Sequence, residues 1–175
     1  MGRSRPRQPR LLNAAELQHY AVQALARRAR SIAELRRLLE RRAADPADIP
    51  AVLDKLKEYG LLDDERFAQA YASWRLENNR LGQRRVERDL RAHLVAPKLA
   101  KKAVAAVYEE VDESAMVRER IVRRLRHRGA PKDRKALASL YRHLIGAGFS
   151  PTAIIPELRR VSRGDTAWME ELEPE

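Results

Sequence analysis

The chain has no cysteine, few aromatic residues and no long hydrophobic run, and each of these absences excludes a class of protein. Without cysteine there are no disulfides, no thiolate metal ligands and no cysteine nucleophile. This composition is compatible with a reducing compartment, and we expect a cytoplasmic protein. Aromatic residues make up 5% of the 175 residues, so we do not expect one large core. No apolar stretch approaches the roughly 18 residues of a membrane-spanning helix, so we expect no membrane partner.

Motifs for catalysis and for cofactor binding are also missing. The sequence has neither a Gly-x-Ser-x-Gly elbow nor a Walker A loop, and its glycines are not clustered as a phosphate-binding loop requires. The four histidines, His19, His93, His127 and His143, lie far apart without the spacing of a metal site. We therefore expect a protein without enzymatic activity, without a cofactor and without a metal.

Positive charge is the strongest feature of the composition. Lys and Arg number 36 against 25 Asp and Glu, which gives a net charge of +11. Such an excess favours binding to a polyanion or to an acidic protein surface, and it is a statement about partners rather than about the fold.

A sequence pattern recurs three times along the chain. Its copies begin with a proline at Pro46, Pro97 and Pro151, each followed by apolar or small residues at helical spacing, and they are 51 and 54 residues apart. A second pattern, in which an amphipathic run opens, starts at Ser31, Gly82 and Asp133, at a spacing of 51 residues. Two patterns with nearly the same period predict three copies of one helical unit, each burying apolar surface partly against its neighbours.

Helix-start signals divide each copy into three helices. Ser31 with Glu34 forms a capping box, and Asp45 with Pro46 gives an N-cap followed by proline at the first helical position. The expected helices start at Asn13, Ser31, Asp45, Asp63, Gly82, Pro97, Asp112, Asp133 and Ser150. We expect Pro156 to kink or shorten the last of them.

The predicted fold is all-α, an elongated and curved array of three tandem three-helix repeats. Apolar periodicity is missing at both ends of the chain, where we expect disorder. The acidic segment at the C-terminal end could fold back on basic surface. The predicted segments are a basic arm at 1–12, repeats at 13–60, 61–111 and 112–163, and an acidic tail at 164–175.

Two groups of residues resemble ligand sites but have simpler explanations. The acidic run from Leu61 to Phe67 could hold magnesium, but the preferred interpretation is a hydrophobic staple, two cap carboxylates and a core Phe, which need no ligand. Phe67, Tyr71 and Trp74 lie on one helical face and could stack nucleic-acid bases. Core packing is the preferred interpretation of these three rings, because large apolar side chains are scarce elsewhere.

Two arginine-rich helix faces are the candidate binding surfaces. Residues 118–135 hold nine Lys or Arg against only Glu119 and Asp133, so the usual acidic partners one turn away are missing. We expect three arginines of this run to lie opposite an apolar stripe, so that reversing their charge leaves the core untouched. Other arginine pairs are interpreted as solvated helix surface. The candidates for contact with a partner protein or with nucleic acid are Arg84, Arg88, Arg91, Arg120, Arg123, Arg124 and Arg128.

Four segments carry a resemblance to a known family. They are residues 31–39, 59–71, 82–90 and 140–150, and the most specific part runs through Leu61, Asp63, Asp64, Glu65, Arg66, Phe67 and Tyr71. Over about residues 13–162 the chain resembles the RecX family of bacterial regulators of the RecA recombinase. The sequence departs from the family pattern at His93-Leu94, where the second-unit helix usually ends with a glycine, so this helix lacks the usual capping residue.

The resemblance implies a partner and an activity that composition does not show. It implies three tandem three-helix units that contact the RecA–DNA filament, depress its ATP hydrolysis and strand exchange, and limit its extension. Single- and double-stranded DNA are expected as weaker partners, and the chain is expected to be a monomer. Two alternatives remain open: a general DNA-binding protein acting through phosphate contacts, and a scaffold module for an unrelated acidic partner.

Overall fold

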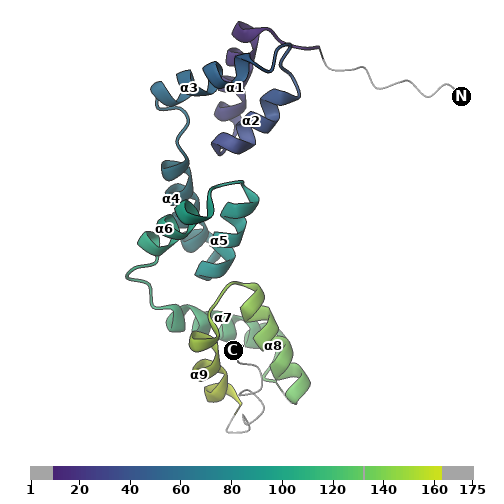
Figure 1. Ribbon diagram of the computed structural model, residues 1–175. Coiled ribbons are helices and arrows are strands. Elements are labelled where there is room, and N and C mark those ends of the chain that lie inside the picture. Colours follow the sequence, from purple (N-terminus) through teal and green to yellow (C-terminus); the bar gives the residue numbers. More distant parts are fainter. Residues whose placement is uncertain (1–9, 132, 163–175) are drawn as a thin grey trace, which may run out of the picture.

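The computed structural model describes residues 10–131 and 133–162 as a chain of helices (Figure 1). Within these residues strand pairing is limited to one isolated bridge between Leu12 and Ala43. No described helix is long and apolar enough to cross a bilayer. The helices are α1 (Ala14–Arg27), α2 (Ile32–Glu40), α3 (Asp48–Glu58), α4 (Asp64–Trp74), α5 (Gln83–Ala92), α6 (Pro97–Val107), α7 (Glu113–Arg128), α8 (Arg134–Gly146) and α9 (Pro151–Val161), and a π-helical turn η1 (Arg75–Asn79) extends α4.

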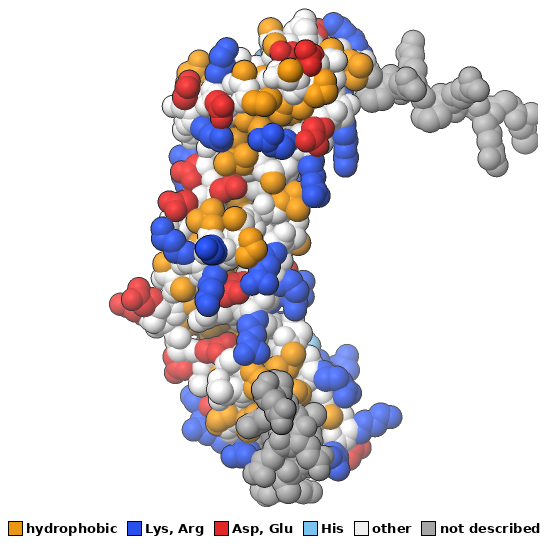
Figure 2. Space-filling model, in the orientation of Figure 1, with side chains coloured by type: hydrophobic (Ala, Val, Ile, Leu, Met, Phe, Trp, Pro, Cys, Tyr) orange, Lys and Arg blue, Asp and Glu red, His pale blue; other side chains and the backbone are white. Residues whose placement is uncertain are grey.

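The helices form three groups that follow one another along an elongated, bowed body (Figures 1 and 2). Helices α1–α3 lie at one end, α4–α6 in the middle and α7–α9 at the other end. This arrangement confirms the predicted all-α fold class. The residue at which one unit ends and the next begins stays a prediction, because it concerns which segments fold on their own.

Each group of helices has its own small core. Leu17, Leu35 and Leu53 are buried in the first cluster, and Leu144, Phe149 and Leu158 in the third. The middle cluster has fewer large apolar side chains, because four of its nine buried residues are alanines: Ala68, Ala72, Ala100 and Ala103. Leu76 and Val111 pack against both the middle and the third clusters. The middle unit therefore gains apolar contact from its neighbour.

Most helix starts are capped as the sequence predicts. Ser31 and Glu34 form the expected capping box, and Asn13 forms another with Glu16. The carboxylates of Asp63, Asp112 and Asp133 accept hydrogen bonds from backbone amides at the starts of α4, α7 and α8. Ser150 caps α9 in the same way.

Of the acidic run at 61–67, only Asp63 caps α4. Asp64 accepts a hydrogen bond from the Ile32 amide at the start of α2, at 2.8 Å, and Glu65 pairs with Lys102 at 3.3 Å, so the prediction of two cap carboxylates at this helix start was right for one of them. No group of three or more candidate metal ligands occurs among the described residues.

Three details differ from the sequence-based expectations. Asp45 does not cap α3 directly; its carboxylate accepts the Ala47 amide at 2.9 Å, and this turn delays the helix start to Asp48. Pro156 does not shorten α9, which continues to Val161. Trp74 is 52% exposed and so is not a core residue, whereas Phe67 and Tyr71 pack against the middle core as expected.

The departure at His93-Leu94 is resolved by an unusual backbone conformation. Leu94 has φ +62°, in the left-handed region that glycine occupies at the corresponding helix end, where Gly148 has φ +94°. The amides of Leu94 and Val95 donate to the carbonyls of Arg91 and Leu90, as in a Schellman helix end. The chain therefore keeps this cap without a glycine, at the conformational cost of a left-handed leucine.

The two junctions between units are held by hydrogen bonds at equivalent positions. Ser31 Oγ donates to the His93 carbonyl oxygen at 2.5 Å, and the Gly82 amide donates to the Ala147 carbonyl oxygen at 2.9 Å. Ser31 and Gly82 are both N-caps, and each contacts the residue just before a left-handed residue of the next unit. This equivalence explains why the sequence period joins Ser31 to Gly82.

Candidate anion-binding surface

The seven candidate arginines do not form one equivalent set. On α5, Arg84, Arg88 and Arg91 are exposed, as expected. Arg91 pairs with Glu87 one turn earlier, at 3.5 Å, and is therefore partly neutralised. Arg88 reaches toward the third unit, with 3.5 Å between its Nη2 and the Gly146 carbonyl oxygen. The three α5 candidates thus have different surroundings: Arg84 faces solvent, Arg91 is in a local ion pair and Arg88 lies at a junction between units.

The four candidates on α7 converge. Arg120, Arg123, Arg124 and Arg128 line one open cleft of about 370 Å³. Its other wall comes from the π-helical turn and from α8, so that residues distant in sequence meet there. The remaining lining residues are Asn78, Asn79, His127 and His143.

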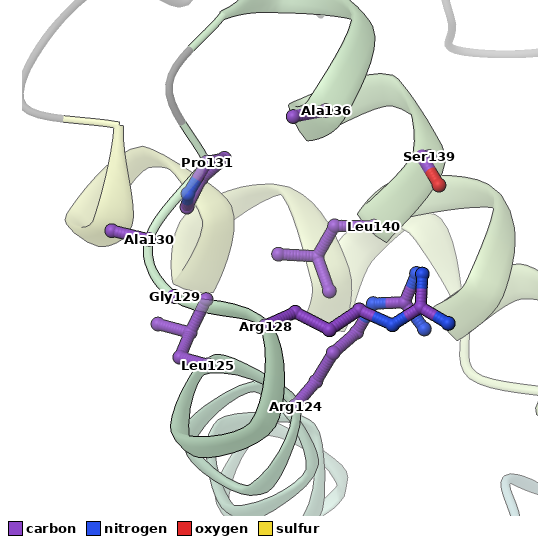
Figure 3. A pocket seen from close by; sticks show the side chains of 9 residues that line it. All are labelled: Arg124, Leu125, Arg128, Gly129, Ala130, Pro131, Ala136, Ser139 and Leu140. Atoms are coloured by element: carbon purple, nitrogen blue, oxygen red, sulfur yellow. The ribbon is translucent and has the colours of Figure 1, made fainter.

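Two further hollows adjoin this cleft. One, of about 450 Å³, lies between the middle and third units and shares Asn79, Arg120 and His143 with the cleft. Arg75 and Arg85 also line it. The other, of about 260 Å³, lies between α7 and α8, and the side chains of Arg124 and Arg128 extend from α7 toward α8 beside Leu140 (Figure 3). We call these three hollows together the basic cleft.

None of the described residues that line the basic cleft is acidic. Burial, and then the neighbouring Arg123, lower the pKa of Arg120. Burial and the guanidinium groups of Arg124, Arg120 and Arg128 lower the pKa of His143. Both pKa shifts have a common cause, because several cationic side chains lie close together in a partly desolvated part of the cleft. A bound anion would relieve this repulsion.

Arg120 has a structural role that the sequence did not reveal. It is half-buried, and its Nη1 lies 3.5 Å from the Asn79 and 3.4 Å from the Arg80 carbonyl oxygens. Its Nε is buried and has no hydrogen-bond partner within the part of the chain that the structure describes. A glutamate at this position would face two carbonyl oxygens, so Arg120 is not simply a solvated residue. That its reversal leaves the core untouched stays a prediction.

Arg118 also differs from the other basic residues of its run. Its Nε and Nη2 donate to the two carboxylate oxygens of Glu157 at 3.0 and 2.9 Å. Glu157 is 4% exposed and also accepts from Arg160 at 2.9 Å. Arg118 therefore ties α7 to α9 and does not belong to the basic cleft. An acidic residue between Pro156 and Leu158 in the last helix was the one sequence signal of this pair.

Sequence reasoning missed the residues that other elements bring to the cleft. Asn79 lies in the π-helical turn, Arg85 on α5 and His143 on α8. Their convergence depends on how the units pack, and local sequence patterns contain no information on that.

The geometry defines a class of protein: a curved array of three-helix units with a basic cleft where two units meet. Family models of RecX match this chain, the first three-helix domain over residues 19–56 and the second over residues 63–104. The Regulatory protein RecX of Halorhodospira halophila is 34% identical over 131 residues, which cover 74% of this chain and 78% of that protein. The chain belongs to the RecX family.

Other relatives and a solved structure agree with this assignment. The Regulatory protein RecX of Deinococcus radiodurans is 32% identical over 162 residues, covering 90% of this chain and 75% of that protein. That of Ralstonia nicotianae is 32% identical over 149 residues, covering 85% and 87%. The crystal structure of RecX from Lactobacillus salivarius shares the fold, with a TM-score of 0.68 over 86% of this chain and 97% of that chain, at 17% identity.

Proposed function

We propose that this chain modulates the RecA recombinase, mainly as an inhibitor, and that it does so without catalysis. It binds the RecA–DNA filament and depresses ATP hydrolysis, extension and strand exchange. One observation supports this most: a cleft lined by arginines and histidines, with no acidic lining residue among those described, lies on a long curved body of the RecX family.

The elongated body accounts for how such a protein could inhibit. Its three units can contact several filament subunits at once, and contacts spread over several subunits resist the rearrangements that accompany ATP turnover. The basic cleft would then bind acidic filament surface or the phosphates of the DNA. We propose that the protein acts as a monomer in the cytoplasm, where the filament forms.

The second candidate function is general DNA binding through phosphate contacts. The same cleft favours it, because the guanidinium groups that line it are suited to phosphates. Arg75 and Arg85 are partly neutralised by Asp89, at 3.2 and 2.8 Å, so the arginines of α7 supply most of this positive charge. The two functions differ in stoichiometry. A modulator of growing filaments acts below one molecule per recombinase subunit, since one bound molecule can stop growth for many subunits. A competitor for the strand acts only when it is abundant enough to coat the DNA.

The test is RecA ATPase on single-stranded DNA with this chain titrated in. We expect inhibition at substoichiometric amounts and no nucleotide hydrolysis by the chain alone. Inhibition that appears only at amounts sufficient to cover all the DNA would instead support general DNA binding.

A further inference from the structure

The hollow between α7 and α8 combines two chemistries that fit one kind of ligand. Its apolar part is formed by Leu125, Pro131 and Leu140, and Arg124 and Arg128 extend from α7 along its other side toward α8 (Figure 3). A phosphate chain would use the arginines but leave the apolar part uncovered. A peptide with an aromatic side chain flanked by carboxylates uses both.

Such a peptide is present in the chain itself. Residues 165–175 contain no Lys or Arg, a single tryptophan at Trp168, and five carboxylate side chains, those of Asp165, Glu170, Glu171, Glu173 and Glu175. These residues lie outside the described part of the chain. We propose that the acidic segment 165–175 docks on the basic cleft, with Trp168 in the hollow of Figure 3 and its carboxylates at Arg124 and Arg128, and that it competes there with anionic partners.

The reach of this segment is sufficient. The described chain ends at Ser162, directly after α9, and α9 packs along α7. Trp168 is the sixth residue after Ser162, so it can lie up to about 20 Å from there when the connection is extended at about 3.3 Å per residue. Helix α7, with 16 residues, is only about 24 Å long at 1.5 Å per residue. Because Ser150 contacts Glu113 and Glu157 pairs with Arg118, α9 runs in the same direction as α7. Ser162 therefore lies toward the end of α7 that lines the hollow, and Trp168 can reach it.

Covalent attachment favours this occupant over a separate acidic peptide. A short connection gives an effective concentration in the millimolar range, so even weak contacts keep the segment docked. Competition then follows from mass action. If the segment is docked about nine-tenths of the time, the apparent affinity of an anionic partner falls about tenfold.

Docking can be measured on the full chain without any recombinase. Trp74→Phe leaves Trp168 as the single tryptophan, because the chain has two. Acrylamide, a neutral quencher, then reports the exposure of Trp168. We expect weak quenching at low salt and stronger quenching at about 1 M salt, where the screening length falls to about 3 Å.

Charge reversal identifies the docking place. In this background, Arg124→Glu with Arg128→Glu should expose Trp168 at low salt. The matched control, Arg36→Glu with Arg37→Glu, reverses two exposed arginines on α2 and should change nothing. Helical circular dichroism shows whether each variant folds, and the salt titration of the unreversed chain tests docking even if one does not. Full exposure of Trp168 at low salt, or protection that survives reversal of Arg124 and Arg128, overturns the proposal.

Competition is tested separately with an oligothymidylate as the anionic probe. Trp168→Ala removes the anchor but keeps every charge, so we expect it to tighten oligothymidylate binding several-fold. A segment that acts only through its net charge predicts unchanged affinity, and that result would overturn the docked model. This inference does not depend on the proposed function, because a chain that fails to inhibit the recombinase can still show docking.

Discussion

Gly82 and Gly148 lie in direct backbone contact across the junction between the middle and third units. The Gly82 amide donates to the Ala147 carbonyl oxygen at 2.9 Å, and the Arg84 amide donates to the Gly148 carbonyl oxygen at 3.2 Å. A Cβ atom on Gly82 would overlap the backbone of Gly148 and Phe149. The N-terminus of α5 therefore approaches the end of α8 closely only because both residues are glycine.

Gly82→Ala should destabilise this junction. We expect a loss of about 1–3 kcal/mol in unfolding free energy, because the added methyl group has no space and the atoms in its way are backbone. Gly146→Ala is the matched control, since no atom of the described residues lies within 4 Å of a Cβ there and the residue ends α8. That control should be neutral or stabilising by up to about 1 kcal/mol. Equal denaturant midpoints for the two variants would contradict the close approach.

At position 94 a glycine variant should be more stable than an alanine variant, which is the reverse of the usual order in a helix. At φ +62° an alanine keeps the left-handed strain and glycine relieves it, so Leu94→Gly should be more stable than Leu94→Ala by about 1 kcal/mol. The opposite order should hold at Ala92, the last residue of α5, where Ala92→Gly should lose about 0.5–1 kcal/mol. Chemical denaturation of the three variants measures both differences, and a Leu94→Ala variant as stable as Leu94→Gly would show that Leu94 is not strained.

Ionisation of Glu157 should make part of the unfolding free energy depend on pH. Hydrogen bonding to Arg118 lowers the pKa of Glu157, against the opposing effect of burial. A carboxyl group whose pKa is lower in the folded state stabilises the fold above its unfolded pKa of 4.5 and loses this contribution as pH falls through the folded pKa. Glu157→Gln should therefore be less stable than the parent at neutral pH, and the difference should shrink in acid. Thermal melts across pH measure this, and a difference that does not vary with pH would argue against the ion pair.

His143 should couple anion binding to pH. Burial and the neighbouring Arg124, Arg120 and Arg128 lower its pKa, and a bound anion offsets these cations and raises it. The anion complex then holds more protons than the free protein, so affinity rises as pH falls toward and below the ordinary value of 6.5. Oligothymidylate titrations at several pH values should show this trend, and His143→Asn should weaken it. An unchanged trend in that variant would mean that His143 does not face the bound anion.

The sequence predicted the helices well because their signals are local. Capping residues such as Ser31 and Asp112, and the repeated prolines, act within one turn of the chain. It predicted the cleft only in part. The α7 arginines were found from an unbalanced charge run, but nothing local distinguishes Arg118, which pairs with Glu157, from Arg124, which lines the cleft. That distinction depends on which residues α8 and α9 place opposite α7.

The exposed ring of Trp74 shows the same limit. Its spacing from Phe67 and Tyr71 indicates one shared helix face, but the π-helical turn begins at the next residue, Arg75. The Arg75 guanidinium lies 5.4 Å from the centre of the Trp74 ring. Helical periodicity predicted the face, and it could not predict where the core ends along it.

The central claim is that the basic cleft is the surface through which this chain inhibits the filament. The direct test is RecA ATPase with the triple variant Arg123→Glu, Arg124→Glu and Arg128→Glu, which spares the half-buried Arg120. The matched control reverses Arg36, Arg37 and Arg41, which are exposed in the first unit. We predict that the cleft variant needs at least about tenfold more protein for half-inhibition, equivalent to about 1.4 kcal/mol of binding free energy, while the control inhibits like the parent. Equal inhibition by the cleft variant and the control, with helicity retained in both, would contradict the claim.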